Sequence, residues 1–536
     1  MKNRKTSNNI RIIPRLDVKG PNLVKGIHLE GLRVLGKPED FALQYYRDGA
    51  DELLYMDIVA SLYGRNNLLQ IVEKTSQNTF IPLAAGGGVR TLGDIRALLR
   101  AGAEKVVVNT AAISNPDFIA KAAKTFGSQC IVLSIEAKKQ LNGSYEAYTN
   151  NGRERTGIDV FQWAKRAAEL GAGEILITSI DKEGTGEGYD IELVKKITDS
   201  VSIPVIACGG AGKKEHIAEI IKGGGADAAS AASIFHYNYL ENISPDSFRY
   251  QEEGNIDFLK RKSQIKEYLE GRIAPASIIK VKSFLADMDI ACRKSFEVQR
   301  SASDAKKNYP SVAIIDYGLG NLFSTRKALE YAGANVAITD DPKMIESVDG
   351  LILPGVGAFG DGMKGLKERG FIGPIKSAVA KGKLLFGICL GMQLLMAEGE
   401  EFGHHQGLDL IKGKVIRLKE SKINDSYYKI PHIKWNGVYS PKLNYKKTKI
   451  SDIWKGTVLD NIEEGTPFYF IHSYVVVPEN HSNILALTDY GDSTFCSVIS
   501  KDNIFGCQFH PEKSGQAGLK YYENMIGLIK NIKNRR

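Results

Sequence analysis

The sequence predicts an α/β protein with a (β/α)8 barrel in its N-terminal half and a further domain behind it. Two observations predict the barrel. In the first 240 residues, short apolar runs of strand length alternate with helical patterns, which is typical of parallel sheets built from βαβ units. The segment 81–88 (IPLAAGGG) also recurs as 203–210 (IPVIACGG), 122 residues later, and 54–57 matches 176–179 at the same offset. Two halves of four βα units each would close an eight-stranded barrel.

Length and composition set the general class. A chain of 536 residues is too long for one compact core, and its net charge of +9 suits phosphorylated small molecules. No nucleic-acid motif, signal peptide or membrane-length apolar run is found, and we expect a cytoplasmic protein with no nucleic-acid or membrane partner. The six cysteines are scattered without metal-ligand spacing, so we expect no metal.

The first half can be divided into elements. Strands are expected near residues 11–17, 52–58, 80–85, 105–109, 130–136, 174–179, 204–208 and 226–230. One helix illustrates the pattern: Asp159 is a favourable N-cap, and Val160, Trp163, Ala164 and Ala167 then fall on one face.

Active sites of this fold lie at the C-terminal ends of the strands. The residues found at these ends are Asp17, Asp57, Gly86, Gly87, Gly88, Asn109, Glu136, Thr178, Asp181, Gly209, Gly210 and Ser233. Glycines half a barrel apart expose backbone N–H groups, which favours two facing phosphate sites and a doubly phosphorylated substrate. Tight βα turns are the alternative explanation for these glycines.

Asp17 and Glu136 occupy equivalent places in the two half-barrels. Two carboxyl groups across the barrel mouth can act as general acid and base. Solvated carboxylates at strand ends, or partners of nearby Lys19, explain the spacing equally well.

Cys389 carries the clearest chemical signal in the second half. The segment 387–393 (GICLGMQ) follows the apolar run 384–386, and glycines on both sides of a nucleophile allow a sharp strand-to-helix turn. About 120 residues later, His510 and Glu512 supply a base and a carboxylate that can orient it. These three residues predict a nucleophilic triad.

Several long motifs together resemble imidazole glycerol phosphate synthase. Residues 10–292 resemble its cyclase subunit through 11–19 (RIIPRLDVK), 126–130 (FGSQC) and 231–236 (AASIFH). Residues from about 310 onward resemble its glutaminase subunit, a class I glutamine amidotransferase, through 316–321 (DYGLGN), 354–359 (PGVGAF) and 470–474 (FIHSY). The implied domains are a barrel at 1–292, a linker at 293–309 and a class I glutamine amidotransferase α/β domain at 310–536.

The resemblance implies a role for each site. Cys389 would attack the glutamine carboxamide, with His510 as proton shuttle and Glu512 orienting it. The released ammonia would attack PRFAR, N'-[(5'-phosphoribulosyl)formimino]-5-aminoimidazole-4-carboxamide ribonucleotide. Imidazole glycerol phosphate and 5-aminoimidazole-4-carboxamide ribonucleotide (AICAR) would form, with Asp17 and Glu136 as acid and base. No cofactor is needed.

Further positions follow from the same resemblance. The oxyanion and glutamine contacts would be Gly355, Val356, Gly357, Leu390 and Gln393. The substrate and phosphate contacts would be Lys25, Gly87, Gly88, Asn109, Thr110, Thr178, Glu183, Gly184, Gly209, Gly210, Ala232 and Ser233.

Four charged residues begin strands of the barrel: Arg11, Glu52, Lys105 and Glu174. Their alternating signs predict a salt-bridged ring, and their positions match the family's ammonia gate. The alternative is ordinary solvated residues at strand starts. The domain partner of the barrel would then be the glutaminase of the same chain.

Two departures keep other functions open. The family usually has Asp where this chain has Glu136 and Glu183. An added methylene moves a carboxylate by about 1.5 Å, more than the roughly 0.5 Å that catalytic geometry tolerates. One alternative is a paralogue that amidates a sugar precursor for surface polysaccharide, and another is a non-catalytic barrel that only binds the glutaminase.

Overall fold

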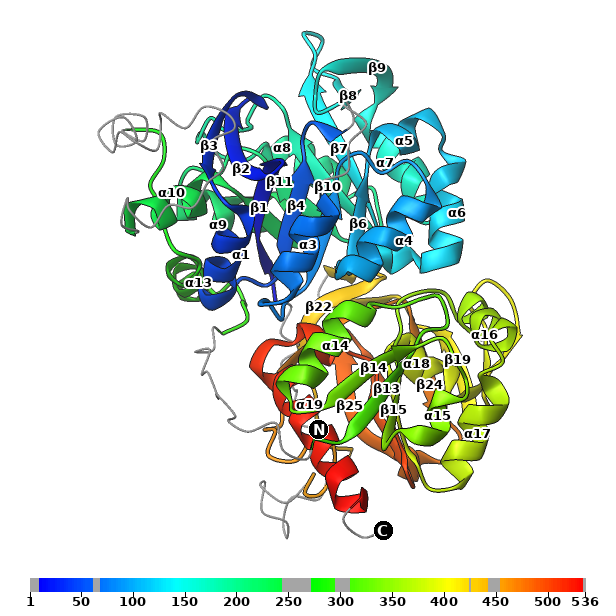
Figure 1. Cartoon of the computed structure of the whole chain (residues 1–536). Helices are drawn as coiled ribbons and strands as arrows, with labels where there is room; N and C mark the ends of the chain where they lie inside the picture. Colours follow the sequence, from blue (N-terminus) through cyan, green and yellow to red (C-terminus); the bar gives the residue numbers. More distant parts are fainter. Residues whose placement is uncertain are drawn as a thin grey trace. The chain divides into compact units, whose positions relative to one another are not determined.

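The structure is a computed structural model that describes residues 9–60, 68–242, 271–294, 309–423, 426–441 and 454–533 (Figure 1). The chain divides into two compact units with the boundary between residues 297 and 298. Each unit is described by itself. Among the described residues, no helix combines the length and apolarity needed to cross a membrane.

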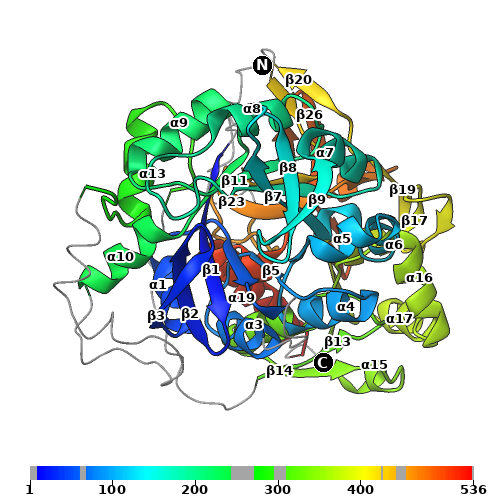
Figure 2. The same cartoon turned by 90° about the horizontal axis from the view of Figure 1, so that it is seen from above.

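The first unit is the predicted closed barrel of eight parallel strands (Figure 2). Each strand pairs with its two neighbours, and pairing of the sixth barrel strand with both the fifth and the seventh completes the closure. The strands, in order, are β1 (Arg11–Lys19), β4 (Leu53–Asp57), β5 (Leu83–Gly86), β6 (Lys105–Val108), β7 (Ile131–Lys139), β10 (Glu174–Ser179), β11 (Val205–Cys208) and β12 (Ala228–Ala231). All eight predicted strands are present.

Helices surround these strands in the order that a (β/α)8 barrel requires. They are α1 (Pro38–Arg47), α3 (Leu68–Ser76), α4 (Leu92–Ala101), α5 (Thr110–Ser114), α6 (Asp117–Phe126), α7 (Val160–Glu169), α8 (Ile191–Thr198), α9 (Lys214–Gly224), α10 (Ser233–Asn242) and α13 (Ile278–Asp287). Helix α7 confirms its prediction, because Asp159 accepts hydrogen bonds from the backbone N–H groups of Phe161 and Gln162 and the predicted apolar face is buried.

Carboxylates join neighbouring strands at the N-terminal end of the barrel. Asp51 accepts from the N–H of Ile12 at 2.9 Å, and Glu104 accepts from that of Leu83 at 2.9 Å. Asp227 does the same for Val205 at 3.0 Å. Because buried backbone N–H groups need an acceptor, these bonds stabilise the starts of the strands.

Two hairpins, which the sequence did not predict, extend from the C-terminal ends of β1 and β7. They are β2 (Asn22–Ile27) with β3 (Glu30–Gly36), and β8 (Tyr145–Thr149) with β9 (Glu154–Asp159). Leu29 of the first hairpin packs with Tyr148 of the second and with Ile180 after β10. This apolar cluster ties both hairpins together over the barrel mouth.

The barrel unit extends slightly beyond its predicted end. Arg293, expected to begin the linker, is buried; its Nε donates to Asp51 at 2.9 Å and its Nη2 donates to the carbonyl of Ala50 at 2.6 Å. Lys282 also donates to Asp51, at 2.5 Å. Residues 295–308 of the expected linker lie outside the described residues.

The second unit is centred on a seven-stranded sheet in the order β14-β13-β15-β16-β27-β26-β25. Its first five strands are parallel, and β26 and β25 are antiparallel additions. The strands are β13 (Ser311–Ile315), β14 (Asn335–Thr339), β15 (Gly350–Leu353), β16 (Leu384–Ile388), β25 (Ile484–Tyr490), β26 (Ser493–Lys501) and β27 (Ile504–Cys507).

Helices and smaller sheets complete this unit. The helices are α14 (Leu322–Tyr331), α15 (Met344–Ser347), α16 (Phe359–Glu368), α17 (Ile372–Ala380), α18 (Leu390–Leu394) and α19 (Gly515–Lys533). One small sheet contains β17 (Met396–Gly399), β18 (His405–Gln406), β19 (Ile411–Arg417) and β24 (Tyr474–Pro478). Two-stranded sheets are formed by β20 (Ser421–Ile423) with β21 (Ser426–Tyr428) and by β22 (His432–Gly437) with β23 (Pro467–His472).

Candidate active sites

Cys389 lies at the sharp turn between β16 and α18. Its φ of +50° and ψ of −105° are unusual for a residue with a side chain, and place it in a strained turn. A Cβ on Gly387 would approach the backbone of Gly391 to 2.7 Å, and one on Gly391 would collide with the carbonyl of Leu353. The two flanking glycines are therefore required by the turn that presents the thiol.

His510 follows β27, beside the strand that leads to the thiol. Its Nδ1 hydrogen-bonds to Glu512 Oε1 at 2.7 Å, and Tyr522 donates to the other oxygen of Glu512 at 3.2 Å. Burial lowers the pKa of His510, but Cys389 and Glu512 outweigh it and raise that pKa well above its usual value. Since Cys389 is among the charges that act on His510, the two side chains lie close together. The three predicted triad residues therefore meet.

The predicted oxyanion segment packs against the start of α18. A Cβ on Gly355 would collide with the Gly391 backbone N and with Leu390, so only glycine allows this approach. Tyr317 donates to the carbonyl of Pro354 at 2.5 Å and holds the turn from the other side. Val356 is buried here, and Gly357 has a φ of +147°.

Gln393 and Gln508 connect this region to the sulfur. Gln393 Nε2 donates to the carbonyl of Tyr474 at 3.0 Å and to Gln508 Oε1 at 3.2 Å. Gln508 Nε2 in turn donates to Cys389 Sγ at 3.4 Å. The sequence interpretation included Gln393 but not Gln508, although Gln508 stands two residues before His510.

Glu401 is a second residue that the sequence did not indicate. Its carboxyl is buried, it accepts from the N–H of Phe359 at 2.8 Å, and burial raises its pKa to about 7. Glu401 lies outside every motif quoted above, so no sequence signal marked it.

Asp17 of the barrel is paired with a residue that the sequence interpretation passed over. Arg15 Nε donates to Asp17 at 2.7 Å, while Arg15 Nη1 donates to Thr178 at 3.2 Å and to the Cys208 sulfur at 3.4 Å. Burial lowers the pKa of Arg15, but the neighbouring Asp17 carboxylate raises it well above its usual value. Asp17 and Thr178 are thus brought together through Arg15.

Lys25 and Glu183, both predicted as substrate contacts, bind each other. They form a buried ion pair between the β2–β3 hairpin and the loop after β10. Burial lowers the pKa of Lys25, and the charge of Glu183 raises it above its usual value. Lys25 therefore keeps its charge although it is buried.

Glu136 is held by the second hairpin. Its Oε2 accepts a hydrogen bond from the backbone N–H of Gly152, in the β8–β9 turn, at 2.7 Å. Burial raises its pKa to about 7, with a smaller opposing effect of this hydrogen bond. The carboxyl can therefore gain and lose a proton near neutral pH.

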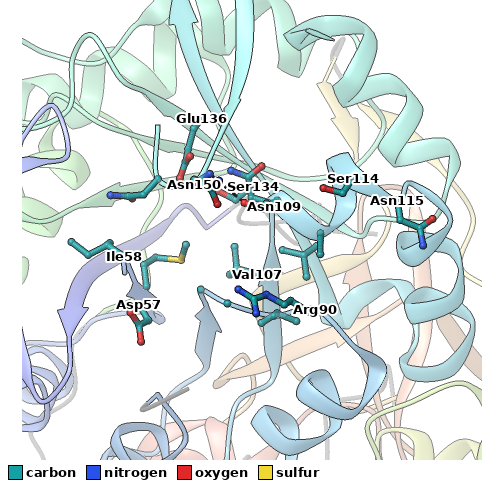
Figure 3. Close-up of a pocket in the computed structure, with 18 residues that line it drawn as sticks. Asp57, Ile58, Arg90, Val107, Asn109, Ser114, Asn115, Ser134, Glu136 and Asn150 are labelled. Atoms are coloured by element: carbon teal, nitrogen blue, oxygen red, sulfur yellow. Dashed lines mark hydrogen bonds between the residues drawn. The ribbon is translucent and has the colours of Figure 1, made fainter. Parts of the chain in front are cut away.

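A pocket of about 370 Å³ opens beside Glu136. Figure 3 shows Glu136, Ser134, Asn109 and Asn150 gathered at one end of it, with Asp57 and Arg90 toward the other. Six residues predicted at the strand ends or as substrate contacts line it, namely Asp57, Gly87, Gly88, Asn109, Thr110 and Glu136. Asp17, Lys25 and the predicted residues from Thr178 to Ser233 are not among its lining residues.

Asn109 is oriented by the second hairpin. One of its amide N–H groups donates to the carbonyl of Tyr148 at 3.1 Å, so its oxygen faces the other way. This oxygen has no partner among the described residues. Asn109 therefore offers the pocket an acceptor, which suits an N–H or O–H group.

The glycines of the other half-barrel are required by close packing. Gly184, Gly209 and Gly210 have φ of +76°, +92° and +105°, and a Cβ on Gly210 would collide with the carbonyl of Gly188. Ala232 and Ser233 are buried at the start of α10. Packing requires these glycines, as it does Gly87, whose Cβ would collide with Asp57.

The predicted ring of four charges is confirmed at the other end of the barrel. Arg11 pairs with Glu52 at 2.8 Å and with Glu174, and Lys105 pairs with the same two carboxylates at 2.5 Å each. All four side chains are at most 1% exposed. Burial raises the pKa of Glu174, but Arg11 and Lys105 outweigh it and leave that pKa lowered.

Comparison with known proteins supports both units. Residues 11–241 match the family described as "Histidine biosynthesis protein", and residues 313–527 match "Glutamine amidotransferase class-I". The chain is similar to the imidazole glycerol phosphate synthase subunit HisF of Legionella pneumophila, with 61% identity over 207 residues. This match covers 39% of the chain and 98% of that protein. The chain therefore belongs to the imidazole glycerol phosphate synthase family, as a fusion of a HisF-type barrel with a class I glutamine amidotransferase domain.

Proposed function

We propose that the chain hydrolyses glutamine at Cys389 and uses the ammonia on PRFAR, giving imidazole glycerol phosphate, AICAR and glutamate. One observation carries the proposal. The same chain contains the Cys389 turn, with His510 beside it, and a HisF-type barrel. A glutaminase produces ammonia, and a barrel of this family supplies its consumer.

The glutaminase chemistry follows from the triad. Cys389 passes its proton to His510, and the thiolate attacks the carboxamide carbon of glutamine. Ammonia leaves as His510 returns the proton, and water then hydrolyses the thioester to glutamate. Glu512 keeps His510 in the orientation and charge state that this shuttle needs.

Binding of the carboxamide falls to the residues around the thiol. Backbone N–H groups of the 355–357 turn and of Leu390 would stabilise the oxyanion. Both N–H protons of Gln393 are directed at protein acceptors, so its contact with glutamine is through its amide oxygen. An amide oxygen is suited to the ammonium or amide N–H groups of the substrate.

In the barrel, Glu136 and Asp17 act as the acid and base pair. Glu136 supplies an exchangeable proton, because its pKa is about 7. Asp17, ion-paired with Arg15, supplies the acceptor. Glycines 87 and 88 and Thr110 offer donors to one phosphate, while Asn109 accepts from an N–H or O–H group of the substrate.

The remaining predicted contacts serve the second phosphate. Glycines 184, 209 and 210, with Ala232 and Ser233, present backbone N–H groups near the buried ion pair of Lys25 and Glu183. When the substrate binds, the Lys25 ammonium leaves Glu183 and pairs with the substrate phosphate. The ring of Arg11, Glu52, Lys105 and Glu174 is the gate through which ammonia enters the barrel.

One assay tests the proposal: the purified chain is incubated with PRFAR and either glutamine or an ammonium salt, and AICAR formation is followed. We expect AICAR with both nitrogen sources. No AICAR with either would contradict the proposal. Activity with the ammonium salt alone would show a competent barrel but contradict the glutaminase or the transfer of ammonia. No observation above favours the polysaccharide or scaffold alternatives.

A further inference from the structure

Gln508 lies buried directly beside the sulfur of Cys389. It has no exposed surface, and its backbone N–H donates to the carbonyl of Ser497 at 2.9 Å, which fixes it to β26. Its side-chain Nε2 donates to Cys389 Sγ at 3.4 Å. A buried amide held this close to a nucleophile affects how readily the nucleophile forms.

The direction of this hydrogen bond is set by a backbone carbonyl. Tyr474 O accepts from Gln393 Nε2 at 3.0 Å, so the nitrogen of Gln393 faces that way, and it also reaches Gln508 Oε1 at 3.2 Å. Because an N–H group needs an acceptor, the oxygen of Gln508 must face Gln393. Its N–H group must therefore face Cys389.

A histidine pair supports the same carbonyl from the other side. His472 Nδ1 approaches Tyr474 O at 2.9 Å, and a carbonyl can only accept, so Nδ1 carries the proton. His472 Nε2 then accepts from His432 Nδ1 at 3.0 Å. Burial lowers the pKa of His472 to about 3, so the ring stays neutral and the arrangement does not reverse near neutral pH.

Two other neighbours of the sulfur within the described part of the chain, Ile471 and His510, do not duplicate this donor. The carbonyl of Ile471, 3.9 Å from Sγ, can only accept, and so favours the protonated thiol. In the proposed glutaminase chemistry His510 takes the thiol proton and returns it, so a neutral His510 no longer donates to the sulfur. Gln508, by contrast, keeps its N–H donor in every protonation state of the triad.

We propose that Gln508 is a positioning residue of the glutaminase, whose amide N–H holds the Cys389 sulfur in the attacking orientation and stabilises its thiolate. The inference rests on the proposed glutaminase chemistry. A thiolate accepts hydrogen bonds more strongly than a thiol or a thioester sulfur, so this contact favours the state that attacks. Gln508 also links the nucleophile to Gln393, the predicted glutamine contact.

Two substitutions separate this role from simple packing. Gln508→Leu removes the donor to Cys389 and the acceptor for Gln393. Gln508→Glu keeps the shape and the acceptor for Gln393, but directs a carboxylate oxygen at the sulfur. A merely structural Gln508 would tolerate Glu better than Leu, whereas a donor to the thiolate would tolerate Glu worse.

The main measurement is the pH dependence of Cys389 alkylation by iodoacetamide in the full chain, read from the modified peptide by mass spectrometry. A hydrogen bond to a charged group changes the pKa of that group by about one unit. We expect the alkylation midpoint to rise by about one unit in Gln508→Leu and by more in Gln508→Glu. The same change at exposed Gln406, Gln406→Leu, is the control and should keep the wild-type midpoint.

Steady-state kinetics supply the second measurement. In Gln508→Glu we expect the glutaminase kcat to fall more than about tenfold, with the KM for glutamine within about twofold, because Gln393 keeps its acceptor. Thermal unfolding checks that each variant folds, and Gln508→Met replaces the Leu variant if that one does not.

An unchanged alkylation midpoint in the folded variants, or a wild-type profile in Gln508→Glu, would overturn the proposal. Alkylation needs no glutamine turnover. A wild-type chain that hydrolyses no glutamine but shows the midpoint shifts would therefore contradict the proposed function and leave the role of Gln508 standing.

Discussion

The carboxylate of Glu136, at the end of β7, accepts a hydrogen bond from the backbone N–H of Gly152, 2.7 Å away in the β8–β9 turn. Gly152 has a φ of +74° and follows two further residues of positive φ, Asn150 and Asn151. The strained β8–β9 turn thus places a backbone N–H beside the Glu136 carboxyl, and the longer Glu side chain brings that carboxyl within reach. The longer acid and this hairpin fit each other.

Replacement of Glu136 by the shorter Asp should therefore slow the reaction in the barrel. In Glu136→Asp the carboxylate withdraws from Gly152, and the lost hydrogen bond to a charged group is worth about 2 kcal/mol. We expect ammonia-dependent AICAR formation from PRFAR to fall by at least about tenfold. Glu154→Asp, exposed on the same hairpin, is the matched control. A large gain in rate would instead mean that Glu136 is unsuited to PRFAR and serves another substrate.

Glu136 should also make the stability of the barrel depend on pH. Its folded pKa of about 7 lies above the ordinary value of 4.5, so its contribution is complete below about pH 4.5 and lost as the pH rises through 7. Glu136→Gln stays neutral, and should gain up to about 3 kcal/mol over the wild type between pH 4.5 and 8. Hydrogen exchange of residues 131–139, compared at equal pH, measures the difference. A gain that did not grow with pH would contradict the raised pKa.

The ring at the other end of the barrel should be sensitive to loss of one member. Lys105→Met leaves the buried Glu52 and Glu174 with Arg11 as their remaining ion-pair partner among the described residues. Removal of one partner of a buried pair costs about 3–5 kcal/mol. We expect the free energy of unfolding, measured with urea, to fall by this amount. The double variant Lys105→Met/Glu174→Met should lose less, because the unpaired carboxylate is then removed too. If the double variant lost as much as Lys105→Met, or the sum of the two single losses, the ion pair between Lys105 and Glu174 would be contradicted.

Cys389→Ala separates the two reactions of the chain. We expect it to abolish AICAR formation with glutamine and to leave the reaction with ammonium salts near the wild-type rate, because the barrel does not use the thiol. Both rates are measured by AICAR release from PRFAR. Loss of both reactions in a folded variant would show that the thiol also supports the barrel, contrary to the proposed division.

Glu512→Gln tests whether the Glu512 charge raises the pKa of His510. Burial lowers the pKa of His510 and the charges of Cys389 and Glu512 raise it, so removal of the Glu512 charge should lower that pKa. We expect glutaminase kcat to fall on the order of a hundredfold and its pH dependence to move to lower pH. Tyr522→Phe, which removes the hydrogen bond to Glu512 but keeps the Glu512 charge, should cost far less. A pH profile unchanged by Glu512→Gln would contradict the coupling.

Local patterns predicted most of the barrel. Strand-length apolar runs and the repeat at 81 and 203 located all eight strands, and Asp159 marked the start of α7. The two hairpins were missed, because β2–β3 and β8–β9 are antiparallel additions stabilised by contacts with each other, such as Leu29 with Tyr148. Such contacts join residues far apart in the sequence.

The sequence by itself determined which residues we propose for the chemistry: the thiol between two glycines, its histidine and glutamate, and four alternating charges at strand starts. These are local signals of turn geometry and strand periodicity. Only the tertiary structure decided their partners, because Arg15 on Asp17, Gly152 on Glu136 and Gln508 on Cys389 are set by burial and by the folding of separate segments onto one another. Burial of this kind, which no linear pattern encodes, raises the pKa of Glu136 to about 7.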